Sequence, residues 1–143
     1  MIRELKDDVL KSIAKPVEVV NDEIRVLLND MLETMKTNGG VGLAAPQIGI
    51  SLQLAVIEVG GVIYKLINPI ILKQKGEQIS DEGCLSLKGV SGKVYRPEKI
   101  VITALNENGE KVKFSAYKDL ARVLSHEIDH LNGILFIDKL IKE

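Results

Sequence analysis

The two histidines of this 143-residue chain lie four residues apart, in the sequence His126-Glu127-Ile128-Asp129-His130, which is an HExxH motif. Each residue of an α-helix turns the chain by about 100°, so residues four apart point in directions that differ by only about 40°. Both imidazoles can therefore reach one metal ion, and Glu127 can take a proton from a water on that ion. The motif predicts a metal-dependent hydrolase.

The same residues could instead match the motif by chance, on a buried helix whose histidines are hydrogen-bonded within the core. The composition weakens that alternative, because the chain has 2 histidines and both belong to one helical face. Leucine or isoleucine would pack there at a lower cost of desolvation. The pattern therefore favours a metal site.

A catalytic site of this kind needs a third protein ligand and an open position for water. The HExxHxxGxxH spacing of one protease class would put a histidine at position 136, but the residue there is Phe136. A downstream carboxylate is also scarce, since only Asp138 and Glu143 follow the motif. We expect the third ligand upstream, where Cys84 is the best candidate because a thiolate binds Zn²⁺ or Fe²⁺ and Gly83 lets the backbone approach. Taken alone, a single cysteine is more often a small buried core residue.

Three segments together resemble the motifs of the peptide deformylase family. Residues 82–86 (EGCLS) are similar to the family's EGCLS motif, residues 126–131 (HEIDHL) to its HExDHL motif, and residues 40–47 (GVGLAAPQ) to its GxGLAAxQ motif. They occur in the family's order, and the flanking segments extend the resemblance over nearly the whole chain. Ser125 and Lys88 depart from it, where the family usually has glutamine and proline. We expect effects on hydrogen bonding around the site or on loop rigidity.

The resemblance implies an enzyme that removes the formyl group from the N-terminal formyl-methionine of newly synthesised polypeptides and releases formate. One divalent ion would be held by Cys84, His126 and His130. Fe²⁺ is the native ion that the resemblance implies, and Zn²⁺, Co²⁺ or Ni²⁺ could replace it. Water on the ion would be the nucleophile, with Glu127 as general base and then general acid.

The resemblance also implies which residues meet the substrate. Negative charge on the formyl oxygen would be stabilised by the side-chain amide of Gln47 and the backbone N–H of Leu85. The backbone of Val41, Gly42 and Gly83 would pair with the substrate peptide in extended form. Nascent chains as substrates would be compatible with a transient contact to the ribosome.

Two helices and several hairpins must position these side chains. Apolar residues spaced by three and four predict a helix from about residue 24 to 35, capped by Asn21 or Asp22, and a second over 117–132 that carries the HExxH motif. Runs of β-branched residues predict hairpins over 52–67 and 100–116, an interruption at Asn68-Pro69, and a last short strand over 134–137. We predict an α+β fold in which antiparallel sheets pack around the central HExxH helix.

The composition limits the other classes of function. With 19 basic and 20 acidic residues and 3% aromatic residues, neither phosphate neutralisation nor base stacking is favoured, so stable nucleic-acid binding is not expected. The length predicts a single catalytic domain over 1–143. No run is long enough for a membrane span, the N-terminus matches no secretory signal, and a lone cysteine favours a reducing compartment. We expect the bacterial cytoplasm.

Two other functions fit the same residues. A related enzyme could hydrolyse another small N-acyl amide, which a comparison of formyl and acetyl peptides would distinguish. A metal-binding protein without catalysis would need a fourth protein ligand, and it would need neither Glu127 nor Gln47. Asp129 has two interpretations, because it could orient a histidine or face solvent.

Overall fold

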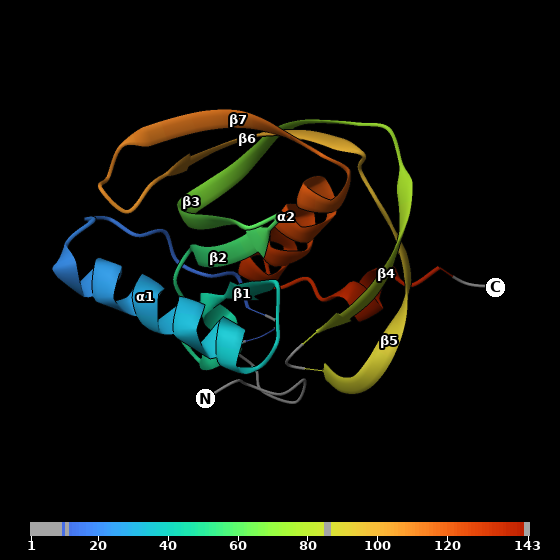
Figure 1. The fold of residues 1–143 in the computed structure, drawn as a ribbon, viewed down its shortest axis with the longest axis horizontal. Coiled ribbons are helices and arrows are strands. Elements are labelled where there is room, and N and C mark those ends of the chain that lie inside the picture. The colour runs from blue at the N-terminus through green and yellow to red at the C-terminus, as the bar shows by residue number, and fades with distance from the viewer. Residues whose placement is uncertain (1–9, 11, 85–86, 142–143) are drawn as a thin grey trace.

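Two antiparallel sheets enclose one α-helix, and a second α-helix lies outside them (Figure 1). The computed structural model describes residues 10, 12–84 and 87–141, without the side chains of residues 87–89. The larger sheet has the strand order β1-β2-β3-β6-β7, and the smaller one pairs β4 with β5. The elements are α1 (Asp22–Thr37), β1 (Gly42–Ala44), η2 (Ala45–Ile48), β2 (Leu54–Val59), β3 (Val62–Lys75), β4 (Gln78–Cys84), β5 (Leu87–Arg96), β6 (Lys99–Leu105), β7 (Lys111–Tyr117), α2 (Lys118–Leu131) and η3 (Phe136–Lys139).

The enclosed helix is α2, which carries the HExxH motif and lies within a residue of its predicted bounds. Its buried Leu124 and Ile128 pack with Ile102 of β6 in one hydrophobic cluster. The helix ends at Leu131 with Asn132 as its C-cap, and Gly133 follows with φ 74°, a left-handed conformation that glycine adopts without steric cost. The predicted α+β fold around a central helix is confirmed.

β2 lies between the two helices and is buried on both faces, which explains its unbroken apolar run. Leu54 and Val56 pack in a cluster with residues of α1, whereas Ile57 packs in the cluster of α2. Successive side chains of a strand point to opposite faces, so these alternating contacts follow from the strand geometry. β2 therefore contributes to the hydrophobic clusters of both α1 and α2, one on each face of the strand.

α1 forms where the sequence predicts it. The Asn21 side chain accepts a hydrogen bond from the backbone N–H of Ile24 at 3.1 Å, which caps the first turn. Leu28, Met31 and Met35 form its buried face. Neither of the described α-helices is long and apolar enough to cross a membrane.

Both predicted hairpins are present as β2–β3 and β6–β7, but β3 continues beyond its predicted end. The strand passes through Asn68-Pro69, where its register with β6 shifts between Ile67 and Ile70. Asn68 has φ 53°, and its side chain bonds both backbone groups of Val17, at 2.8 and 2.9 Å. A bulge accommodates proline because no ladder N–H is needed there, so the proline bends the strand without ending it.

The predicted strand over 134–137 is wrong, because the chain there forms the 3₁₀ helix η3. The Asp138 carboxylate accepts a hydrogen bond from the backbone N–H of Leu135 at 3.0 Å, and Phe136 is buried. Local capping therefore satisfies the backbone without a strand partner. The β4–β5 hairpin was not predicted, since polar residues and glycines interrupt the apolar alternation over 78–96.

Candidate metal centre and active site

Cys84, His126 and His130 meet where the end of β4 approaches α2. Their ligand atoms all lie within 4.8 Å of one another, and Cys84 Sγ is 3.3 Å from His130 Nε2. Sulfur and nitrogen ligands of one tetrahedral Zn²⁺ would be separated by about 3.6 Å, given bonds of about 2.3 and 2.0–2.1 Å. The group fits one divalent ion, and a thiolate with two imidazoles suits Zn²⁺ or Fe²⁺.

Local structure explains why these side chains converge. The histidines are one helical turn apart on α2, with ring centroids separated by 5.0 Å. Cys84 is the last residue of β4, directly after a register shift between Gly83 and Cys84. Phe136, which occupies the position where another protease class has its third histidine, stacks on the His126 ring with centroids 6.1 Å apart. That position therefore packs against a candidate ligand instead of supplying one.

Glu82, which had no role in the sequence analysis, fixes the orientation of His126. Its Oε1 lies 2.6 Å from His126 Nδ1, so Nδ1 donates and the lone pair of Nε2 is directed toward Cys84 and His130. The carboxylate also accepts two hydrogen bonds from Arg96, at 2.9 and 2.8 Å. Burial alone would raise the pKa of Glu82, but the hydrogen bonds from His126 and Arg96 lower it to about 2. Glu82 therefore stays ionised.

The two histidines have different protonation in the metal-free protein. Burial lowers the pKa of His130 to about 3, and the charges of His126 and Arg96 act in the same direction. Burial would also lower the pKa of His126, but Glu127 and hydrogen bonds with Cys84 and Glu82 raise it to about 10. His130 is thus neutral and ready to bind a metal, whereas a metal must displace a proton from His126.

Glu127 projects into the same site from α2. Its carboxylate is buried, with Oε2 3.9 Å from His126 Nε2 and with Oε1 lacking a hydrogen-bond partner in the described part of the chain. The pKa of Glu127 is raised to about 7, mainly by burial. The negative charges of Glu82 and Asp129 raise this pKa further, whereas the positive charges of His126 and Arg96 lower it. Near neutral pH this carboxyl can both accept and donate a proton.

Gly42 lets β1 come close to the Glu127 side chain. A Cβ atom at position 42 would lie 2.6 Å from Glu127 Oε2, far inside ordinary contact. The predicted role of Gly42 concerned its backbone toward substrate, and this contact adds a second reason for glycine there. Gly83 is different, because among the described residues a Cβ there would meet Val90 O alone, at an ordinary contact distance of 3.6 Å.

Gln47 lies on η2 with its amide held at both ends. Its Oε1 accepts a hydrogen bond from Ala44 N at 2.9 Å, and its Nε2 lies 3.3 Å from Cys84 Sγ. The amide nitrogen is thereby directed to the candidate metal centre. Leu85, the predicted second oxyanion donor, lies outside the described residues.

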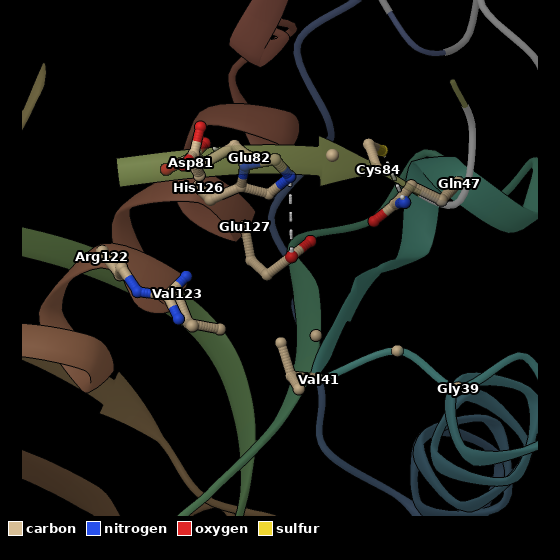
Figure 2. Close-up of a pocket in the computed structure, with 13 residues that line it drawn as sticks. Gly39, Val41, Gln47, Asp81, Glu82, Cys84, Arg122, Val123, His126 and Glu127 are labelled. Carbon is tan, nitrogen blue, oxygen red and sulfur yellow. Dashed lines mark hydrogen bonds and ion pairs between the residues drawn. The ribbon is translucent and has the colours of Figure 1, made fainter. Parts of the chain in front are cut away.

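An open pocket joins these groups (Figure 2). It has a volume of about 380 Å³ and contains Gln47, Cys84, His126 and Glu127 in its lining. The three residues predicted to pair with substrate, Val41, Gly42 and Gly83, also line it. The structure therefore brings these members of the predicted site to one pocket, whereas His130 is not among the residues that line it.

The Asp129 carboxylate is mostly buried and, among the described residues, forms no hydrogen bond to a histidine. It pairs with Arg96 and with Lys139, whose Nζ is 3.0 Å from Asp129 Oδ2. Arg96 is 2% exposed and joins Asp129 to Glu82. Neither Arg96 nor Glu82 was assigned a role from the sequence. For Glu82 a signal was available, since residues 82 and 84 of a strand share one face.

Ser125 and Lys88, the two residues that depart from the family motifs, differ in what the structure shows of their side chains. Ser125 is buried on α2, and its Oγ has no hydrogen-bond partner among the described residues. It lines a hollow next to Arg96 and Asp129, not the pocket of Glu127. The side chain of Lys88 lies outside the described part.

Known proteins resemble the whole chain. The model of the polypeptide deformylase family matches residues 1–143. The chain is 52% identical to a peptide deformylase of Acetivibrio thermocellus over 99% of this chain and 83% of that one, and 51% identical to one of Alkaliphilus metalliredigens over 100% and 97%. The crystal structure of a peptide deformylase from Thermotoga maritima superposes with a TM-score of 0.97 at 39% identity, over 99% of this chain and 97% of that one. The crystal structure of a peptide deformylase from Synechococcus elongatus in complex with actinonin superposes with a TM-score of 0.96 at 42% identity, over 100% of this chain and 79% of that one.

Proposed function

This chain belongs to the peptide deformylase family, and we propose that it removes the formyl group from the N-terminal formyl-methionine of newly synthesised polypeptides by metal-dependent hydrolysis, releasing formate. One observation carries the proposal: the buried Glu127 carboxylate lines one pocket with Cys84 and His126, two of the three side chains that could hold a metal, and one of its oxygens lacks a partner among the described residues. A purely structural metal site has no use for such a carboxylate.

The proposed metal ligands are Cys84 Sγ, His126 Nε2 and a ring nitrogen of His130. Their spacing supports one ion per chain, and the family supports Fe²⁺ as the native ion, with Zn²⁺, Co²⁺ or Ni²⁺ as substitutes. A divalent ion held there supplies a Lewis acid that lowers the pKa of water and polarises the formyl carbonyl. The bond from Glu82 keeps Nδ1 of His126 protonated, so that Nε2 is the atom available to the ion.

Glu127 is the proposed general base and general acid. Its carboxylate takes a proton from the attacking water as the water oxygen bonds to the formyl carbon. It then gives a proton to the leaving amine as the carbon–nitrogen bond breaks, so water is consumed and formate and a free amino terminus form. The pKa of about 7 that burial produces suits a group that has to do both near neutral pH.

Gln47 and Leu85 are the proposed donors to the negative charge that develops on the formyl oxygen. The amide of Gln47 is supported by its fixed orientation, because the bond from Ala44 N holds Oε1 away and leaves Nε2 toward the site. A donor that is fixed before the reaction stabilises the transition state without reorganisation. The backbone N–H of Leu85 remains a prediction from the resemblance.

The substrate peptide is proposed to bind in extended form between β1 and the end of β4. Val41, which directly precedes β1, Gly42 of β1 and Gly83 of β4 line the pocket, so a peptide laid between them would lie against the backbone of both segments. Main-chain pairing would accept many nascent sequences. We further propose that residues 1–143 act as one catalytic domain in the bacterial cytoplasm, with a transient contact to the ribosome.

Formate release from formyl-Met-Ala-Ser tests the proposed function. The protein is loaded anaerobically with Fe²⁺ and compared with Glu127→Gln at equal metal content, a change that preserves side-chain volume. We expect rapid release by the wild type and a loss of about 10²–10⁴-fold in the variant. Absence of release from folded, fully metallated wild type would overturn the proposal.

A further inference from the structure

The pocket of Glu127 extends one helical turn along α2 and ends at a cation, Arg122. Arg122 and Val123 precede His126 and Glu127 by four residues each, which corresponds to about 6 Å along the helix axis. Both line the pocket. Figure 2 shows the Arg122 side chain extending from α2 into the pocket, on the side away from Cys84 and Gln47.

The guanidinium of Arg122 remains available for a further partner. Its Nε is paired with Asp119 Oδ1 at 3.2 Å, and the two side chains are 33% and 74% exposed. Pairs this exposed are weak, because water screens the attraction between their charges. The pair uses one of the five N–H donors of arginine, so the terminal nitrogens can donate to a ligand.

The surroundings of Arg122 favour an occupant that is unbranched, apolar along its length and neutral at its end. Val41 and Val123 supply apolar walls, to which the methylene stem of Arg122 adds. Asp81 and Glu127 also line the pocket, and their carboxyl groups disfavour an anionic occupant. A neutral oxygen that accepts a hydrogen bond from Arg122 avoids that repulsion.

A substrate bound as proposed above would direct its first side chain toward this end of the pocket. Alternate side chains of an extended peptide point to opposite faces. In this proposed pose the formyl group lies at Cys84 and the histidines, and the peptide backbone lies between β1 and β4. One face of the bound peptide is then turned to α2. An unbranched side chain of four or five atoms spans the single turn from His126 to Arg122.

We propose that Arg122 is a specificity-determining residue that donates a hydrogen bond to a neutral oxygen at the end of the substrate's first side chain. The protein then accepts peptides that begin with N-formyl-glutamine or N-formyl-methionine sulfoxide in addition to N-formyl-methionine. The reaction is unchanged: water adds to the formyl carbon, the amide bond breaks, and formate and the free amine leave. This inference rests on the proposed function.

The test compares kcat/KM for formyl-X-Ala-Ser peptides in which X is norleucine, glutamine or methionine sulfoxide. The norleucine side chain is unbranched and of similar length but has no oxygen. The ratio of kcat/KM for each oxygen-bearing peptide to kcat/KM for the norleucine peptide therefore reports recognition of the oxygen. The variants are Arg122→Met, which keeps the apolar stem, and Arg122→Lys, which keeps the charge. Lys111→Met on β7 is the control for loss of an exposed cation.

We expect Arg122→Met to lower both ratios about fivefold, the effect of one hydrogen bond of about 1 kcal/mol. Arg122→Lys should retain part of each ratio, and Lys111→Met all of it. Ratios that stay the same in Arg122→Met would overturn the inference and leave the proposed function intact. If the metallated wild type also fails to hydrolyse formyl-Met-Ala-Ser, the proposed function fails, and the inference fails with it.

Discussion

At the scale of single residues, the site depends on the close approach of β1 to Glu127. The carboxylate has no room to move toward β1, because only the hydrogen of Gly42 fits between the strand and Oε2. The side chain is thereby held in the pocket despite having an oxygen without a partner among the described residues. A group that must transfer protons benefits from such restriction, since small displacements from the reactive geometry are costly.

Gly42→Ala should therefore impair activity more than stability. The added Cβ would displace the Glu127 carboxylate, and a displacement of about 1 Å can reduce the rate about 10²-fold. Gly42 has no positive φ, so alanine fits its backbone and the melting temperature should stay close to that of the wild type. Gly83→Ala, whose Cβ finds ordinary space, is the comparison for folding. Wild-type rates of formate release in Gly42→Ala would contradict the crowding argument.

Glu82→Gln should weaken metal binding. The amide can still accept from His126 Nδ1, but it loses the charge and one of the two acceptors used by Arg96. Loss of such an outer partner typically costs 10–100-fold in metal affinity. Competitive titration of Zn²⁺ against a chromophoric chelator measures the change. Asp81→Asn removes the neighbouring, exposed charge and should leave the affinity unchanged; equal affinities of Glu82→Gln and wild type would refute the role of Glu82.

At the scale of elements, a chain of buried charges joins α2 to β4, β5 and η3. Arg96 on β5 reaches Glu82 on β4 and Asp129 on α2, and Lys139 of η3 completes the chain at the surface. The Arg96 side chain is 1% exposed, so water cannot replace its contacts. Two carboxylates depend on it for neutralisation, which raises the pKa of Arg96 although burial alone would lower it.

Arg96→Met should destabilise the metal-free protein by about 3 to 5 kcal/mol, because it removes the buried cation that Glu82 and Asp129 share. Glu82 would keep only its bond to His126, and Asp129 only its pair with the partly exposed Lys139. Denaturant unfolding measures the difference in free energy. Arg25→Met is the matched control on α1, since Arg25 pairs with the exposed Asp22 and such pairs contribute about 0–1 kcal/mol. An equal loss of unfolding free energy in both variants would contradict the expectation that the buried pairs of Arg96 stabilise the protein more than an exposed pair does.

At the scale of the whole molecule, metal binding should stabilise the protein in a pH-dependent way. An ion that binds only the folded chain adds about 4 kcal/mol at 1,000 times its dissociation constant. The pKa of His126 is raised to about 10 in the metal-free protein, so below that pH the ion has to displace a proton. Affinity therefore falls as pH falls, and the stabilisation shrinks with it.

Melting temperatures with Zn²⁺ and with excess chelator, taken from pH 8 down to pH 6, check this expectation. The difference between the two should be largest at pH 8 and should narrow toward pH 6. Cys84→Ala is the control, because a chain that lacks one ligand should show little difference at any pH. A difference that grows as pH falls would contradict displacement of a proton by the ion.

The sequence by itself determined what depends on local spacing. The positions of His126, His130 and Glu127 on one helix followed from a period of 3.6 residues, and Asn21 marked the start of the other helix by its preference for a capping position. Both hairpins with β-branched strands were equally readable. Cys84 could be selected as a candidate ligand because only a few residue types bind such ions, and its neighbours resembled a known motif.

Only the tertiary structure decided what depends on distant segments meeting. The bond of Glu82 to His126 spans 44 residues and that of Arg96 to Asp129 spans 33, and nothing in local periodicity encodes either. The contact of Gly42 with Glu127 and the stacking of Phe136 on His126 likewise arise between separate elements. The strand predicted at 134–137 failed for the same reason, since the pattern of apolar residues there reflects burial of Phe136 in a capped turn. Periodicity reports which way a side chain points from its own element, whereas its partner is chosen by the packing of all the elements together.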